Sequence, residues 1–115
     1  MKDFDRLINE CLKEVEEAGI TPGIISKWSV NHRAKKRWGS CKRKPGEGYE
    51  IEISSVLLFD DRVSEKACKE TIIHEILHTV QGGNGHTGRW KMFAEQINAK
   101  YGYNIKRVTS GSEKG

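Results

Sequence analysis

The sequence predicts an α+β domain: an N-terminal helix, a small three-stranded sheet that is antiparallel at least in part, a buried central helix and a C-terminal helix. Apolar residues recur every three or four positions in three segments, which predicts three helices. Between the first and the second of these segments they alternate with polar residues, which predicts strands. The chain has 115 residues, enough for one modest core. We therefore expect a single domain over residues 1–108 and a flexible tail over residues 109–115.

The segment from Asp3 to Ala18 is predicted to be an amphipathic helix. Its apolar residues follow the spacing i, i+3, i+4, i+7 from Phe4 to Val15, which places them on one face. Gly19 ends the periodic segment, and a Thr-Pro-Gly sequence follows it. The helix is therefore expected to stop before the first strand.

Three segments, 24–31, 36–43 and 49–54, are predicted to be strands. The first alternates, which places four residues on one face: Ile24, Ser26, Trp28 and Val30. The third alternates most clearly, because Tyr49, Ile51 and Ile53 share one face while two glutamates share the other. A turn rich in Pro and Gly over residues 44–48 predicts that the last two strands form an antiparallel hairpin. Lys42 or Arg43 is then expected to lie near Glu50 or Glu52.

The central helix is predicted to begin after Ser64, whose side chain can cap it, and to run to about Gln81. Residues 72–80 are apolar on nearly every side of this helix except at two histidines and a glutamate. A helix that is apolar all round is buried in its domain. We expect the sheet to cover it.

The last helix is predicted to begin near Thr87, a candidate cap, and to end at Gly102. Residues 103–108 are expected to form a short strand or coil. Large aromatic residues in such positions usually serve packing, so Trp38 and Trp90 are more readily explained as core residues than as walls of a cleft. The apolar stripe of this helix consists of Trp90, Phe93, Ala94, Ile97 and Tyr101.

The pentapeptide His74-Glu75-Ile76-Leu77-His78 predicts a metal site. Residues four apart on a helix share a face, so His74 and His78 can bind one ion, and Glu75 lies beside them as a candidate general base. A catalytic zinc ion takes three protein ligands, and the Gly-rich turn over residues 82–85 can bring His86 back as the third. The alternative is that these histidines are ordinary buried residues. The presence of a glutamate in a buried turn favours catalysis, because an unpaired buried carboxylate is costly.

The composition is typical of a globular intracellular protein. Apolar residues make up 36% and charged residues 31% of the chain, and the sequence contains neither an apolar stretch of membrane-spanning length nor a secretory signal. Cys11, Cys41 and Cys68 form no C-x-x-C pair, which indicates buried free thiols rather than a disulfide framework. We expect a cytoplasmic monomer that is not secreted and does not bind membranes.

One segment of the chain is strongly basic. Residues 18–46 hold eight of the twenty basic residues and no acid, although the net charge of the whole chain is only +4. Such a segment is typical of a nucleic-acid contact, and the alternative is a solvated hairpin whose lysines keep an edge strand soluble. The candidate DNA-binding residues are Arg33, Lys35, Lys36, Arg37, Lys42, Arg43 and Lys44.

Three motifs together resemble the SprT-like metalloprotease family, which includes Spartan and related proteases of DNA–protein crosslinks. They are the string Arg37-Trp38-Gly39-Ser40-Cys41, the pentapeptide 74–78, and Gly85-His86 followed by Trp90-Lys91. The first string also occurs in the related YgjP-like metallopeptidases. Many SprT-like chains continue into a C-terminal zinc ribbon, which this sequence lacks, so any DNA contact is expected from segment 33–44.

The resemblance implies a zincin-like minimal metalloprotease domain with one Zn²⁺ per chain. It implies that His74, His78 and His86 bind the zinc and that Glu75 is the catalytic acid and base. The expected function is a zinc-dependent endopeptidase that cleaves protein or peptide substrates, including proteins bound or crosslinked to DNA. In a bacterium such a protein is expected near the nucleoid. Two other functions stay open: a non-catalytic, zinc-stabilised DNA-binding or adaptor module, and a metallohydrolase of a non-protein amide.

Overall fold

The computed structural model describes residues 1–81 and 88–106. The predictions for the glycine turn, for His86 and Thr87 and for the tail 109–115 lie outside these residues. The described elements follow one another in the order helix, three strands, three helices. Their bounds are α1 Phe4–Glu17, β1 Ile25–Asn31, β2 Gly39–Lys44, β3 Gly48–Ser54, α2 Ser55–Phe59, α3 Glu65–Leu77 and α4 Arg89–Tyr101.

The predicted α+β class is confirmed, with a mixed sheet of three strands in the order β1-β3-β2. The β2–β3 hairpin is antiparallel as predicted, whereas β1 pairs with β3 in parallel. The chain between β1 and β2 crosses the end of β3, where the Ser54 amide donates to the Trp38 carbonyl at 2.9 Å. Strand β3 is therefore central, and β1 and β2 are the two edges of the sheet.

The alternation predicted for the first strand is correct only in its second half. Trp28 and Val30 pack against the core, but Ile24 is 77% exposed and Ile25 takes its place. A β-bulge at Ser26 causes this change, because Ile25 pairs with Tyr49 while Lys27 already pairs with Glu50. The extra residue shifts the side-chain phase by one position.

The second strand begins at Gly39, three residues later than the predicted start at Lys36. In its register with β3, Lys42 lies opposite Glu50 as expected, while the ion pair of that glutamate is with Lys44 at 3.9 Å. This pair is solvated, so it contributes little to stability. Its location is more informative, because it shows that Lys42, Lys44 and Glu50 share one face of the sheet.

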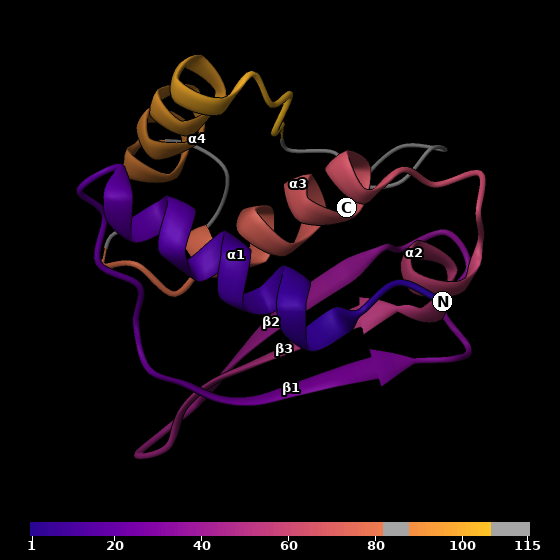
Figure 1. Ribbon diagram of the computed structural model, residues 1–115. Coiled ribbons are helices and arrows are strands. Elements are labelled where there is room, and N and C mark those ends of the chain that lie inside the picture. The colour runs from indigo at the N-terminus through magenta and orange to yellow at the C-terminus, as the bar shows by residue number, and fades with distance from the viewer. Residues whose placement is uncertain (82–87, 107–115) are drawn as a thin grey trace.

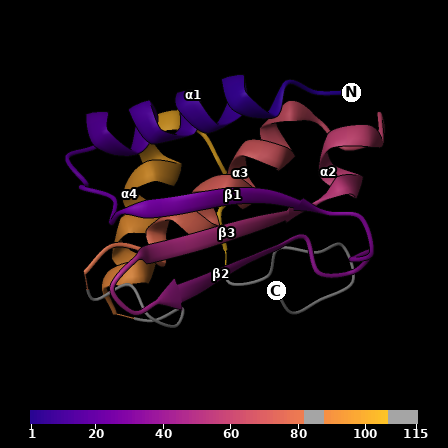
Figure 2. The same ribbon diagram turned by 90° about the horizontal axis from the view of Figure 1, so that it is seen from below.

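All helices lie on one face of the sheet (Figure 1). Seen from below, the three strands lie in front, with α3 and α4 behind them and α1 at the top of the view (Figure 2). Helix α3 is central, since it packs on β2 and β3 and also contacts α1, α2 and α4. Its buried residues include Ile72, Ile73, Ile76 and Leu77, all with no exposed surface, which confirms the predicted burial of this helix.

A half-buried lysine links α1 to α3. The Lys69 ammonium lies 2.6 Å from a carboxylate oxygen of Glu14 and 3.2 Å from one of Glu10. The Tyr103 hydroxyl donates to Glu14 at 2.6 Å, and thereby ties the segment after α4 to the same pair of helices. These charge-assisted contacts hold the chain that passes beside the histidines.

Helix α2 is absent from the sequence prediction. It has only five residues, too few to show a periodicity, and it begins where the Ser54 hydroxyl accepts from the Val56 amide at 3.2 Å. Residues 102–106 have no regular structure, in agreement with the predicted coil. Gly102 ends α4 in the left-handed conformation, also as predicted.

Helix α3 begins after Ser64, whose hydroxyl caps it as predicted by accepting from the Ala67 amide at 3.0 Å. It ends at Leu77 rather than near Gln81. The amides of His78 and Thr79 donate to carbonyls three residues back, and the Thr79 hydroxyl accepts from the Gly23 amide at 2.9 Å. This tightened turn closes the helix directly after the second histidine. At α4 the cap position holds Gly88.

The three cysteines are free, but their burial differs. Cys11 and Cys68 are buried as predicted, whereas Cys41 on β2 is only half-buried. Burial raises the pKa of Cys68 to about 11 and that of Cys41 to about 12. None of the described helices is long and apolar enough to cross a bilayer.

Candidate metal centre

The end of α3 brings His74, Glu75 and His78 together. Their candidate ligand atoms all lie within 4.8 Å of one another. His74 is 2% and Glu75 3% exposed, while His78 is half-buried. The cluster therefore lies in the interior, with one imidazole toward the surface.

A backbone carbonyl orients the first histidine. Nδ1 of His74 lies 2.8 Å from the backbone oxygen of Lys106, which follows α4. A carbonyl oxygen can only accept, so Nδ1 carries the proton and Nε2 carries the lone pair. Histidines that bind metals are usually held in this way through the second ring nitrogen.

Trp90, at the start of α4, contacts both histidines. Its ring centroid lies 4.8 Å from that of His74 and 5.7 Å from that of His78, which it stacks with an interplanar angle of 22°. Its Nε1 donates to the His74 carbonyl at 3.2 Å. Trp90 is 2% exposed, so it is a core residue, as its position in the sequence favours, and it also forms one wall of the site.

Glu75 faces the sheet rather than the tryptophan. Burial raises the pKa of its carboxyl to about 8, and the positive charge of Arg37 opposes this shift only in part. Among the described residues no group donates a hydrogen bond to this carboxyl, and His74 Nε2 lies 4.0 Å from its Oε2. A buried carboxyl without a donor is rare, because its desolvation is not compensated.

A glycine makes room for this glutamate. A Cβ on Gly39 would lie 3.0 Å from Glu75 Oε2 and 3.2 Å from Thr71 Cγ2, which is too close without movement of these side chains. The Gly39 carbonyl also accepts from Arg37 Nε at 3.2 Å. The string Arg37–Cys41 thus packs its glycine on the acidic residue of α3 and keeps an arginine nearby.

These residues fit a divalent metal ion. Two imidazoles and a carboxyl form a donor set typical of zinc, and one imidazole is already oriented by Lys106. The uncompensated carboxyl of Glu75 is a second sign, because a nearby cation stabilises its ionised form. His86, the third ligand implied by the resemblance, lies outside the described residues.

The sequence was compared with models of known protein families. The model of the SprT-like family matches residues 4–109, nearly the whole chain. The chain belongs to the SprT-like family. Neither a search of curated proteins nor a search of solved structures returned a significant match to this SprT-like protein. Membership associates its His-Glu-x-x-His helix with metalloprotease-like domains.

The structure divides the basic residues of the SprT-like domain into separate groups. Arg33, Lys35, Lys36 and Arg37 are exposed in the loop between β1 and β2. On β2 the side chains alternate, so Lys42 and Lys44 share the face of the sheet that bears Glu50, while Arg43 lies opposite Tyr49 on the helix-bearing face. Arg43 is thereby separated from Lys42 and Lys44, whereas Lys42 lines a small cavity together with Arg37 of the loop.

Several residues of the SprT-like site were not found by sequence reasoning. The backbone oxygen of Lys106 has no sequence signal, since any residue can supply it. Gly39 lies in a motif that the sequence did show, but its packing on Glu75 depends on how β2 crosses α3. The contact of Trp90 with both histidines had a partial signal, because this residue shares the motif region of His86.

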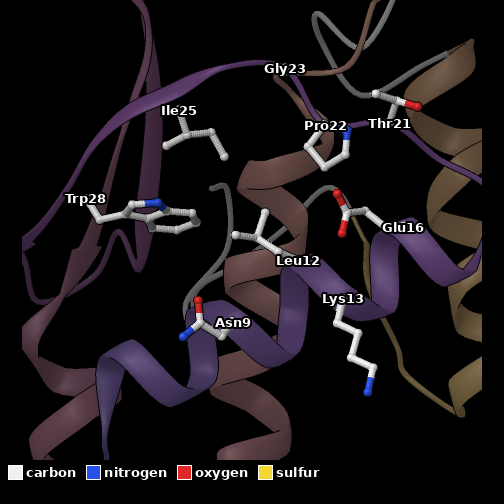
Figure 3. A pocket seen from close by; sticks show the side chains of 9 residues that line it. All are labelled: Asn9, Leu12, Lys13, Glu16, Thr21, Pro22, Gly23, Ile25 and Trp28. Carbon is white, nitrogen blue, oxygen red and sulfur yellow. The ribbon is translucent and has the colours of Figure 1, made fainter.

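A cavity of about 470 Å³ lies between α1 and β1, away from the histidines of the SprT-like site. Leu12 and Trp28 face each other across it, and Lys13 points away (Figure 3). A second cavity, of about 630 Å³, lies where the ends of β2 and α3 meet the start of α4. This second cavity is lined by direct chain neighbours of site residues, namely Thr79 after His78 and Arg89 before Trp90.

Proposed function

We propose that this SprT-like protein is a zinc-dependent endopeptidase. The observation that carries the proposal is the buried carboxyl of Glu75, which has no hydrogen-bond donor among the described residues and lies beside His74 and His78. A purely structural zinc site has no need of such a group, since structural sites are closed by four ligands. A catalytic site needs a proton acceptor next to the metal.

His74, His78 and His86 would hold the zinc ion. Three neutral imidazoles match the catalytic pattern of three protein ligands, and imidazole nitrogen suits zinc among the common divalent metals. When bound, zinc supplies a Lewis acid that polarises a carbonyl group and makes water more acidic. Proton transfer and positioning of the reacting groups would be carried out by residues of the protein itself.

Glu75 would act as the general base and then as the general acid. Its carboxylate takes a proton from the water that attacks the peptide carbonyl, and the resulting carboxyl gives a proton to the departing amine. Burial alone raises the pKa of this carboxyl to about 8, which favours the protonated form needed for the second step. The positive charge of a bound metal ion would favour the ionised form that the first step requires. Gly39 would keep the carboxyl in position from the sheet side.

The substrate chain would bind along the exposed edge of β2. Strand β2 is an edge of the sheet, so its outer backbone groups can pair with an added strand. Gly39, its first residue, packs on Glu75. A peptide paired with this edge would pass beside the catalytic carboxyl, and backbone pairing would select an extended polypeptide rather than a particular side chain.

We expect the zinc-loaded protein to cut unfolded casein at internal peptide bonds. An extended chain can pair with β2, whereas a small amide offers no backbone for this contact. Mass spectrometry of the products would identify the new amino termini, with a panel of small non-peptide amides run beside the casein. Cleavage of the small amides without any cleavage of casein would replace the endopeptidase by the metallohydrolase alternative.

We further propose that substrates include proteins bound to DNA. The support is charge: Arg33, Lys35 and Lys36 are exposed in the loop before β2, and the start of that strand packs on Glu75. Phosphates bound by this loop would keep DNA within reach of the site. Lys42 and Lys44 lie on the face of the sheet away from the helices, and Lys42 lines a small cavity together with Arg37 of the loop, so a DNA contact would extend from the loop onto this face.

DNA affinity is expected to fall steeply with salt. For single-stranded DNA the slope of log K against log salt should be about −0.7 for each phosphate bound, so three contacts give about −2. Fluorescence anisotropy with a labelled oligonucleotide measures this slope, and the triple variant Arg33→Gln, Lys35→Gln, Lys36→Gln should bring it near zero. A slope that is the same in the variant would remove the loop from the DNA contact.

A further inference from the structure

The second cavity, between β2, α3 and α4, carries positive charge on the side of the sheet that holds Glu75. Its volume is about 630 Å³, and it is lined by two arginines, Arg43 and Arg89. None of the described residues that line it is acidic. Within the described part of the chain neither arginine takes part in an ion pair.

This cavity lies on the same face of β2 as the catalytic carboxyl. On β2, Gly39 packs on Glu75, and Arg43 lies four residues further on the same face of the strand. Thr79, in the tightened turn that follows α3, lies four residues after Glu75 and lines the cavity. Four residues of a strand span roughly 13 Å, so an extended peptide that passes Glu75 reaches the cavity about four residues away.

We propose that this cavity is a subsite for an acidic side chain of the polypeptide substrate, whose carboxylate binds Arg43 and Arg89. The proposal rests on the endopeptidase function above and names the substrate class that the function favours. Guanidinium groups bind carboxylates through paired, charge-assisted hydrogen bonds. Tyr49 and Phe93 line the same cavity and provide apolar contact for the stem of a glutamate.

A carboxylate fits this cavity better than a nucleic-acid backbone does. Binding of a single strand requires a basic track that follows successive phosphates. Here the neighbouring basic residues of β2, Lys42 and Lys44, share the opposite face of the sheet. Two arginines in one cavity are suited to one anionic group, and the strand that carries Arg43 begins beside the site proposed to cleave peptide bonds.

The test measures peptide binding and does not require cleavage. Labelled extended peptides of about ten residues, each with a single Glu at a different position, are compared with partners that carry Gln there, using anisotropy with the zinc-loaded Glu75→Gln protein. We expect one position to favour Glu over Gln roughly tenfold, the size expected of hydrogen bonds to a charged group. The double variant Arg43→Gln, Arg89→Gln in the same background should lose this preference.

Two further variants keep the result unambiguous. The pair Arg43→Lys, Arg89→Lys keeps the charge and should retain a reduced preference, which separates a lost contact from a damaged fold. Lys66→Gln removes one exposed positive charge at the start of α3 and should leave the preference unchanged. A preference of equal size in the arginine-to-glutamine variant, or no preference at any position, would overturn the assignment.

Two other outcomes can also be told apart: binding of nucleic acid by the cavity, and failure of the endopeptidase function. If a single-stranded oligonucleotide loses affinity in the arginine-to-glutamine variant while the peptides show no Glu preference, the cavity binds nucleic acid and the proposal is wrong. If the wild-type protein cleaves no peptide but the Glu75→Gln protein still discriminates Glu from Gln through these arginines, the subsite is supported and the endopeptidase function fails.

Discussion

Replacement of Glu75 by Gln is expected to lower kcat/KM for peptide cleavage by about 10²- to 10⁴-fold, the usual contribution of a positioned general acid and base. Gln has nearly the same shape, so it fits the space beneath Gly39, but it cannot take a proton from water at neutral pH. The imidazoles of His74 and His78 are untouched by this change. The variant should therefore keep its zinc while it loses turnover.

The matched control is Glu95→Gln on the exposed side of α4, which makes the same chemical change far from any proposed role. Both variants are compared with the wild type for casein cleavage and for zinc content on the same preparations. Turnover at the wild-type rate in the Glu75→Gln protein would show that this carboxyl is not the general base. Loss of zinc in that variant would indicate instead that Glu75 is a ligand.

Local periodicity predicted the longer elements well. Helix α1 follows from its apolar spacing, which repeats over several turns, and α3 from its continuous apolar run, which predicted a helix buried on nearly every side. Helix α2 was missed, since five residues do not complete two turns. The parallel pairing of β1 with β3 was not predicted either, because pairing between distant strands leaves no local pattern, whereas the β2–β3 hairpin was marked by its turn.

The sequence predicted the histidines and the glutamate of the candidate site, but not the residues that hold them in place. The spacing of His74 and His78 fixes their shared face, because it depends only on helix geometry. The support of the site comes from chain segments far away in sequence: the Lys106 carbonyl binds His74, and Gly39 packs on Glu75. Such contacts depend on the tertiary fold, so they cannot be predicted from the sequence of a single segment.

The basic segment shows why charge counted along a chain differs from charge on a surface. Sequence counting placed Lys42 and Arg43 in one group of seven basic residues. In a strand, successive side chains point to opposite faces, so Lys42 faces away from the helices and Arg43 toward them. Although Lys42 and Arg43 are adjacent in sequence, they therefore have different neighbours. Arg43 lines the cavity beside α4, and Lys42 lies on the face that bears Glu50.

Replacement of His78 by Ala is expected to lower zinc affinity by more than about 100-fold. Changes to residues that merely orient a ligand already cost about 10- to 100-fold, and His78 would be a ligand itself. The variant should still fold, because His78 is only half-buried and lies just after the end of α3 at Leu77. The contact it loses is the stacking of its ring on Trp90. The matched control is His32→Ala, which removes an exposed histidine from the loop after β1.

The most direct test of the central claim is the zinc content of the wild-type, His78→Ala and His32→Ala proteins, measured together with casein cleavage on the same samples. The zinc endopeptidase predicts about one zinc ion per chain in the wild type and in His32→Ala, little zinc in His78→Ala, and cleavage that follows the zinc. Zinc retained in full by His78→Ala, or casein cleavage that persists without zinc, would contradict it.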